Sequence, residues 1–390
     1  MYLIELFFLA YFFYVVLYSL FFAIGGFLYK GQKRILDERS NLRYLILVPG
    51  YKEDSIIVDS ARKNLEVDYD SSKFDLVIIA DSFQAETLES LGKLPLKVHE
   101  VSFEKSTKVK SIKNALENLN DPYDYVIILD ADNVMEKDYL QRVDSFIQET
   151  KSVALQTQRA PKNKNNELAI LDGISESINH HLYRKGSFAL GFHSSLNGSG
   201  MVFNLKLFTE IIFEMDSVGG FDRELEFRLL EKKSSIQYLE QAIVYDEKVD
   251  EGKNFENQRK RWISSQYTYL ARYLKKGVIA LLKGNFVYFN NTVLRNIQLP
   301  RSINLGLLTV ITVLIALFGN PNSTQYWTWI SLWLLNALVI FICIPKSYFN
   351  RKLLKSLLLL PKLFLKMFLL LFKLKGANKK FIHTPHKPSN

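Results

Sequence analysis

Two carboxylates separated by one residue follow a short apolar run in this chain of 390 residues. The run, residues 125–129, is typical of a buried β-strand, and Asp130 and Asp132 come directly after it. Carboxylates are hard oxygen ligands, and Mg²⁺ is usually held by one or two of them together with substrate phosphates. The pair predicts a site for Mg²⁺ or Mn²⁺ and a nucleotide diphosphate, although a solvated turn has the same residue types.

Short β-branched runs alternate with longer helical segments between residues 41 and 273, which predicts an α/β sheet domain. The expected strands are residues 44–48, 74–80, 96–101 and 125–129, and residues 106–118 form an expected lysine-rich helix. Polar turns follow the first, second and fourth strands. Ligands of open α/β sheets bind at the carboxyl ends of the strands, so these turns are expected to converge on one site.

Apolar segments at both ends of the chain predict membrane helices. Residues 1–30 are long enough for one span, and residues 303–344 form a hairpin of two spans around an uncharged turn. The positive-inside rule places the N-terminus outside and the sheet domain in the cytoplasm of a multi-pass cell-membrane protein. The flanking cations are Lys30, Lys33, Arg34, Arg295, Arg301, Lys346, Arg351 and Lys352.

Two further segments are expected at the membrane surface. Residues 353–374 carry four lysines and Pro361 within an apolar run, which favours an amphipathic interfacial helix over a fourth span. Residues 278–300 have a weaker pattern of the same kind. The formal charge of +10 lies largely beside apolar segments, so it indicates membrane lipids as partners and argues against nucleic acid. The single cysteine, Cys343, excludes an intramolecular disulfide and a cysteine-based zinc site.

Six more motifs lie along the sheet domain in order. Residues 48–53 read V-P-G-Y-K-E, with Pro49, Tyr51 and Glu53, and Asp81 ends the second strand. The remaining motifs are the cation Lys108 in the expected helix, the glycine pair Gly198 and Gly200, the acidic segment with Asp222, Glu224 and Glu226, and residues 258–262 with Gln258, Arg259, Arg261 and Trp262.

In this order the motifs resemble those of membrane-integrated glycosyltransferases of family 2, the group of the cellulose, chitin and hyaluronan synthases. The resemblance implies a GT-A fold, a Rossmann-like mixed sheet, in an inverting, metal-dependent hexosyltransferase. It implies that Asp132 binds the metal and that Asp130 holds metal and sugar nucleotide. It also implies that Asp222 is the general base. The implied substrate-binding residues are Pro49, Tyr51, Glu53, Asp81, Lys108, Asp130, Gly198, Gly200, Gln258, Arg259, Arg261 and Trp262.

The chain departs from the family pattern at three places. Phe221 replaces the glutamate that usually precedes the base, and Thr107 replaces a glycine before Lys108. The tail, residues 375–390, is similar to the gating loop of bacterial cellulose synthase, but His383 replaces a valine and the lysine is displaced to Lys387. A disordered cytoplasmic terminus is the alternative for this segment. On a helix, Asp222 and Glu226 share a face while Glu224 points away, so Glu226 is the main rival for the base. We treat His180 and His181 as structural.

The expected donor is a uridine diphosphate sugar, because Asp81 suits a uracil imide, and guanosine diphosphate sugars stay open. The acceptor is either a growing polysaccharide, which is favoured and would be assembled by a homo-oligomer, or a lipid-linked glycan that receives one sugar. A non-catalytic sugar-nucleotide sensor is the alternative from another class, and the presence of a base argues against it. The sequence gives less support to a nucleotidyltransferase, because no glycine-rich phosphate loop opens the fold. A transporter is least supported, since the spans have few polar residues.

Overall fold

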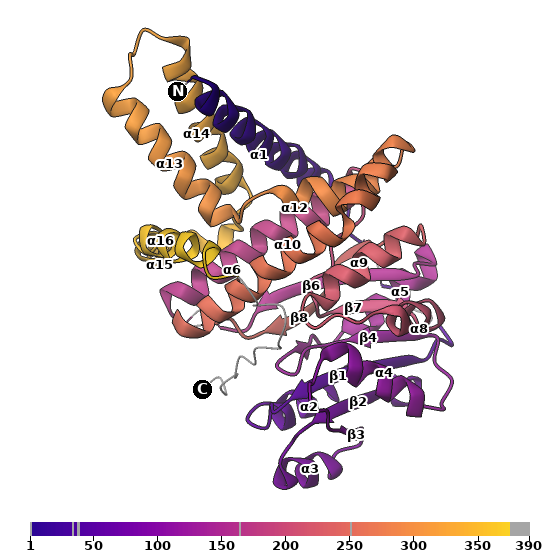
Figure 1. The fold of residues 1–390 in the computed structure, drawn as a ribbon. Helices are drawn as coiled ribbons and strands as arrows, with labels where there is room; N and C mark the ends of the chain where they lie inside the picture. The colour runs from indigo at the N-terminus through magenta and orange to yellow at the C-terminus, as the bar shows by residue number, and fades with distance from the viewer. Residues whose placement is uncertain (1, 33–34, 37–39, 164, 250–251, 375–390) are drawn as a thin grey trace.

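The computed structural model describes residues 2–32, 35–36, 40–163, 165–249 and 252–374 (Figure 1). Lys33 and Arg34, which were expected beside the first span, lie outside these residues. The expected gating loop, residues 375–390, also lies outside them.

One eight-stranded sheet organises the domain between the ends, in the order β3-β2-β1-β4-β7-β6-β8-β5. The first four strands in this order are parallel, whereas β7 is antiparallel to β4 and β6, and β8 is parallel to β6. The sheet is therefore mixed, as expected. The strands are β1 Tyr44–Tyr51, β2 Phe74–Asp81, β3 Lys97–Val101, β4 Tyr125–Ile128, β5 Val134–Met135, β6 Ala154–Pro161, β7 Met201–Asn204 and β8 Gln237–Asp246.

The side chains of β1 show why this sheet has a core on each face. Ile46 and Val48 belong to one buried cluster, and Leu45 and Leu47 belong to the other. Successive side chains of a strand point to opposite faces, so a strand that is apolar throughout must be covered on both. Helices α2 and α5 supply residues to the first cluster, and α4, α8, α9 and α10 supply residues to the second.

The remaining helices up to α12 lie between the strands or follow the last strand, β8. Their bounds are α2 Ile57–Asn64, α3 Ala85–Gly92, α4 Lys108–Asn118, α5 Tyr139–Thr150, α6 Glu167–Asn179, α7 Ser187–Ala189, α8 Leu205–Glu214, α9 Phe221–Glu231, α10 Gly252–Leu282, α11 Phe286–Phe289 and α12 Arg295–Ile297, with π-helices η2 His180–Gly186 and η3 Asn290–Leu294 and 3₁₀-helices η1 Ser71–Lys73 and η4 Lys346–Tyr348.

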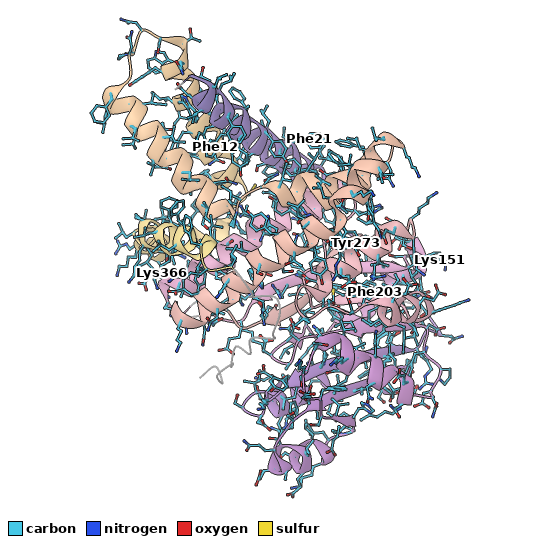
Figure 2. All side chains as sticks on the ribbon, in the orientation of Figure 1. Phe12, Phe21, Lys151, Phe203, Tyr273 and Lys366 are labelled. Atoms are coloured by element: carbon cyan, nitrogen blue, oxygen red, sulfur yellow. The ribbon has the colours of Figure 1, made fainter. Side chains whose placement is uncertain are left out.

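Three helices are long and apolar enough to cross a membrane, and they form a bundle that projects away from the sheet (Figure 1). They are α1 Tyr2–Leu28, α13 Arg301–Phe318 and α14 Thr324–Ile342. Phe12 of α1 packs edge-on against Trp329 of α14, with ring centroids 6.1 Å apart. Figure 2 shows the side chains of this bundle, with Phe12 and Phe21 labelled on α1.

The two segments expected at the membrane surface are both divided in the structure. Residues 278–300 are not one helix, because α10 continues to Leu282 and a turn with Gly284 at φ +78° precedes α11. Residues 353–374 form two helices, α15 Arg351–Leu357 and α16 Leu360–Leu371, which lie across the base of the bundle (Figure 1). Pro361 occupies the first turn of α16, where its missing N–H leaves no hydrogen bond unmade.

Candidate functional site

The turn after β4 holds the two aspartates in different surroundings. Lys108 Nζ, from the start of α4, donates to Asp130 Oδ1 at 2.6 Å and to the Gly198 carbonyl at 2.8 Å. Asp132 is buried, and its Oδ2 accepts from the Glu247 backbone N–H at 3.1 Å. The structure therefore brings Lys108 to Asp130, 22 residues away in sequence, and ties Asp132 to the end of β8.

The loop before β7 is held against the same turn. Ser199 Oγ accepts from the Asp130 backbone N–H at 3.0 Å, and Gln156 Nε2 of β6 donates to the Ser199 carbonyl at 2.9 Å. Gly198 and Gly200 both have positive φ, at +93° and +58°, a region that glycine adopts without steric cost. A Cβ at Gly200 would lie 2.6 Å from Thr157 Oγ1, so this loop requires glycine there for space as well.

The carboxyl ends of β1 and β2 form a second part of the site. Tyr51 pairs in register with Asp81, and Pro49 pairs with Ile79. Asp81 is only 1% exposed, and while its Oδ1 accepts from Ser82 Oγ, its Oδ2 is buried without a hydrogen-bond partner. Glu53 is also buried and begins the turn into α2. A buried, unpartnered carboxylate oxygen is costly unless a ligand donates to it.

Helix α9 presents its three carboxylates in three different states. Glu224 is fully buried and accepts from Arg228 Nε at 2.9 Å and from Tyr269 OH at 3.2 Å. Glu226 is also buried, between the Arg295 guanidinium at 2.5 Å and the Leu196 N–H at 3.0 Å. Asp222 lies in the first turn and is half-buried. Of the three, Asp222 is therefore the one that keeps access to solvent.

Helix α10 carries the Q-x-x-R-W residues along the site. Burial lowers the pKa of Arg261, and Asp130 and Asp222 act in the opposite direction, so this guanidinium lies within electrostatic range of both carboxylates. Arg259 instead pairs with Asp172 of α6, and its guanidinium lies 4.3 Å from the Trp262 ring centroid. Trp262 is 38% exposed, and Gln258 Oε1 is buried without a partner.

The arrangement fits a divalent ion only if a ligand completes the coordination. Asp130 accepts from Lys108, and Asp132 accepts from Asn133 Nδ2 and from the Glu247 N–H. An ionised carboxylate has about four lone-pair sites, so hydrogen bonding and metal binding by one group are compatible. Within the described residues, no group of three or more His, Cys, Asp or Glu side chains gathers as a metal site. Two carboxylates together with substrate phosphates are the donor set that Mg²⁺ and Mn²⁺ accept.

Sequence reasoning missed several residues that hold this site together. Lys162 donates to the Asp132 carbonyl, Ser199 donates to Asn133 Oδ1, and Gln156 fixes the glycine loop. Arg159 of β6 pairs with Glu176 at 2.6 Å and interacts electrostatically with Asp130. The polar run 156–159 gave the only local signal, and its mixture of amides and a cation does not resemble a strand.

His180 has the structural surroundings expected of it. Its ring is buried, its Nδ1 lies 3.1 Å from Tyr238 OH, and burial lowers its pKa to about 4. Cys343 is likewise buried among apolar side chains.

Comparisons with known proteins agree with this geometry. Curated relatives include a beta-monoglucosyldiacylglycerol synthase from Trichormus variabilis, 25% identical over 233 residues, which cover 57% of this chain and 48% of the relative. A probable glucomannan 4-beta-mannosyltransferase 14 from Arabidopsis thaliana is 25% identical over 236 residues, which cover 58% of this chain and 43% of the relative. The chain thus spans about half the length of the curated relatives it matches.

The fold also matches a solved structure. The mannosyltransferase PcManGT from Pyrobaculum calidifontis, in complex with GDP-Man and Mn²⁺, aligns with a TM-score of 0.54 and 16% identity over 86% of this chain and 94% of that one. The mixed sheet is therefore that of a GT-A glycosyltransferase. A family model described as glycosyltransferase-like family 2 matches residues 42–265, more than half of the chain, and the chain belongs to this family.

Proposed function

We propose that this protein is an inverting glycosyltransferase that moves a sugar from a nucleoside diphosphate sugar to an acceptor hydroxyl at the membrane surface. The observation that carries the proposal is the state of the α9 carboxylates. Glu224 and Glu226 are buried in hydrogen bonds to arginines, whereas Asp222 is half-buried and lies near Arg261. A carboxylate that keeps an open side next to a cation has the access that a general base needs.

The donor would lie along the carboxyl ends of β1, β2 and β4. The unpartnered Asp81 oxygen would accept an N–H from the nucleobase, which both uracil and guanine can donate, and uridine is the favoured base. Arg261 would bind the diphosphate, since a guanidinium offers several donors in a fixed plane. The Trp262 ring would lie against the sugar.

Asp132 and Asp130 would hold the divalent ion, which supplies positive charge to stabilise the departing diphosphate when bound. In the proposed step the acceptor oxygen forms a bond to the anomeric carbon as the bond from that carbon to the diphosphate oxygen breaks. Asp222 takes the hydroxyl proton, and the nucleoside diphosphate leaves with the bonding electron pair. A single displacement of this kind inverts the anomeric configuration.

The acceptor would approach from the side of the apolar bundle. By their names, one relative makes a glycolipid and another makes a glucomannan, so both a lipid and a polysaccharide are acceptor classes known among relatives. The three apolar helices support a location in the cell membrane with the sheet domain in the cytoplasm.

The direct test is release of nucleoside diphosphate by the detergent-purified full chain across uridine and guanosine diphosphate sugars, with Mg²⁺ or Mn²⁺ and a membrane lipid extract. We expect turnover on one donor, loss of turnover with EDTA and in Asp222→Asn, and wild-type turnover in Asp216→Asn. Asp216 is a matched control because it lies on the loop before α9 and pairs with Arg272 at the surface. Donor binding without turnover in the wild type would contradict the catalytic proposal and favour the sensor.

A further inference from the structure

A buried arginine on the membrane side of the site lacks hydrogen-bond partners for two of its nitrogens. Arg184 is 6% exposed, and its Nε and one terminal nitrogen, Nη1, are buried without hydrogen-bond partners. Burial lowers the pKa of its guanidinium to about 10. A buried donor without a partner is costly, and a bound ion is one explanation for such a group.

The charges around Arg184 are of both signs. Glu176 acts to raise its pKa, whereas Arg159 and Arg295 act to lower it. Glu176 is already held by Arg159 and Lys248, and Glu226 is held by Arg295. We call Arg159, Arg184, Arg223 and Arg295 the arginine cluster.

Arg223 extends the arginine cluster towards the proposed base. It follows Asp222 directly in α9, and its guanidinium donates to Asn296. Burial and the nearby Arg295 lower its pKa, while Asp222 and Glu226 act to raise it. Among the described residues, neither Arg184 nor Arg223 has a carboxylate within hydrogen-bond distance. The guanidinium groups of Arg184 and Arg223 therefore have carboxylates in electrostatic range but none bonded to them.

The arginine cluster lies between Asp222 and the apolar helix α1. Helix η2, which carries Arg184, packs so closely on α1 that a Cβ at Gly186 would lie 1.9 Å from the Phe22 carbonyl oxygen. Tyr18 of α1 donates to Asn290 Oδ1 of η3 at 3.0 Å. Figure 1 shows α12, which begins at Arg295, between the end of α1 and α9.

Two of the four arginines lie in or next to a π-helical turn. Arg184 lies within the π-helix η2, and Arg295 directly follows the π-helix η3. These are the π-helices in the described part of the chain. A π-turn is wider and less stable than an α-turn, and such turns are frequent at functional sites. The backbone therefore departs from regular helix at the places where the cluster is assembled.

We propose that Arg184, with Arg295 and Arg223 beside it, binds the phosphate of a membrane lipid whose headgroup hydroxyl is the acceptor. This inference rests on the proposed transferase function. Guanidinium groups bind phosphate with paired, charge-assisted hydrogen bonds, which would satisfy the free Arg184 nitrogens. The position beside α1 favours a lipid over an anionic glycan. A neutral acceptor such as diacylglycerol would leave Arg184 unpaired.

A binding experiment tests the site without requiring turnover. Thermal unfolding of the detergent-purified full chain is measured with dioctanoyl phosphatidic acid, dioctanoylglycerol, inorganic phosphate or a glucuronic-acid-containing tetrasaccharide. We expect phosphatidic acid alone to raise the unfolding midpoint of the wild type and of Lys185→Met. Lys185 is the matched control because it neighbours Arg184 in sequence and pairs with Glu240.

The same measurement on Arg184→Met should show no shift with phosphatidic acid. Arg184→Lys should show a smaller shift than the wild type. The lysine ammonium keeps the positive charge but lacks the paired, coplanar N–H donors of a guanidinium. Arg184→Lys also keeps the test usable if Arg184→Met does not fold. An equal shift in Arg184→Met, no shift in the wild type, or an equal shift with dioctanoylglycerol would overturn the proposal. An equal shift with inorganic phosphate or the tetrasaccharide would overturn its assignment to a lipid.

Kinetics then separate this proposal from the transferase function. With phosphatidylglycerol as acceptor in mixed micelles, Arg184→Met should raise the acceptor KM about 10- to 100-fold while the donor Kd stays unchanged. An equal rise of the KM for diacylglycerol in Arg184→Met would contradict a phosphate-binding role, because that acceptor has no phosphate. Failure of the transferase proposal would appear differently, as no nucleoside diphosphate release by the wild type with any donor, while the binding shifts persist.

Discussion

The Lys108 ammonium lies 5.4 Å from the centroid of the Phe221 ring, while the same nitrogen donates to Asp130. By the resemblance to the family motif, Phe221 stands at the position of a glutamate, and here it presents an aromatic ring to this cation. A cation over an aromatic face is attracted without a formal charge pair. Lys108 is therefore left to pair with Asp130 alone among carboxylates within the described residues.

Phe221→Glu should weaken donor binding and destabilise the fold. Phe221 is 7% exposed and packs in the apolar core beneath α9, so the free energy of unfolding should fall by about 2–4 kcal/mol. The new carboxylate would also compete with Asp130 for Lys108. Chemical denaturation and donor titration measure the two effects. Phe221→Leu is the control, with a stability loss of about 1 kcal/mol. Tighter donor binding by Phe221→Glu would contradict this account of Lys108.

Substitutions of Glu226 and Asp222 in α9 should have different effects, the first on stability and the second on rate. Glu226→Gln removes the partner of the buried Arg295, which should cost about 3–5 kcal/mol of stability. Asp222→Asn should change stability by at most about 0.5 kcal/mol and lower kcat by about 10²–10⁴-fold. Urea unfolding paired with turnover at saturating donor makes the comparison. If Glu226→Gln were as stable as the wild type and inactive, Glu226 would be the base.

Gly220→Ala should disturb the helix turn that places Asp222. Gly220 has φ +74°, and a Cβ there would lie 1.9 Å from Ser265 Oγ. We expect a loss of about 1–3 kcal/mol in stability and a lower kcat. Gly92→Ala is the matched control, because its Cβ would meet no atom within 4 Å and it lies in α3. Equal thermal stability and kcat in the two variants would show that the Gly220 turn tolerates a side chain.

His180 should make the fold less stable as the pH falls from about 6.5 to 4. Burial, with Arg184 adding to it, lowers the pKa of His180 to about 4, and Glu176 opposes the shift. The unfolded chain therefore binds a proton in this range that the folded protein does not. The resulting stability is fully present above pH 6.5 and is lost towards pH 4, by at most about 1.4 kcal/mol per pH unit.

The measurement is the free energy of unfolding between pH 4 and 7. The contribution of Asp246 to the pH dependence of stability has the opposite sign. Burial raises the pKa of Asp246 to about 6, so its contribution is lost as the pH rises through that value. The informative quantity is therefore the difference between wild type and His180→Gln, which should have a flatter profile. His99→Gln is the control, because His99 lies on β3 beside Asn114 and is half-buried. Identical slopes for the wild type and His180→Gln would refute the prediction.

Local patterns in the sequence were sufficient to predict the parallel half of the sheet and the three apolar helices. The apolar run before Asp130 predicts β4 because a strand buried on both faces must be apolar throughout. The observed strand is Tyr125–Ile128, one residue shorter than predicted. The other half of the sheet was not predicted. β6 carries polar residues such as Gln156 and Arg159, whose hydrogen bonds are made only when β7, β8 and α6 are in place.

The sequence by itself also determined that Asp222 and Glu226 share a face of one helix, because they are four residues apart. It could not decide between them as the base. The proposal of Asp222 rests on Arg295, 69 residues beyond Glu226, which pairs with Glu226. The arginine cluster was hidden for the same reason, since Arg159, Arg184, Arg223 and Arg295 come from four separate elements. Helical and strand periods are local properties of a sequence, whereas the pairing of buried charges depends on which distant segments the fold brings together.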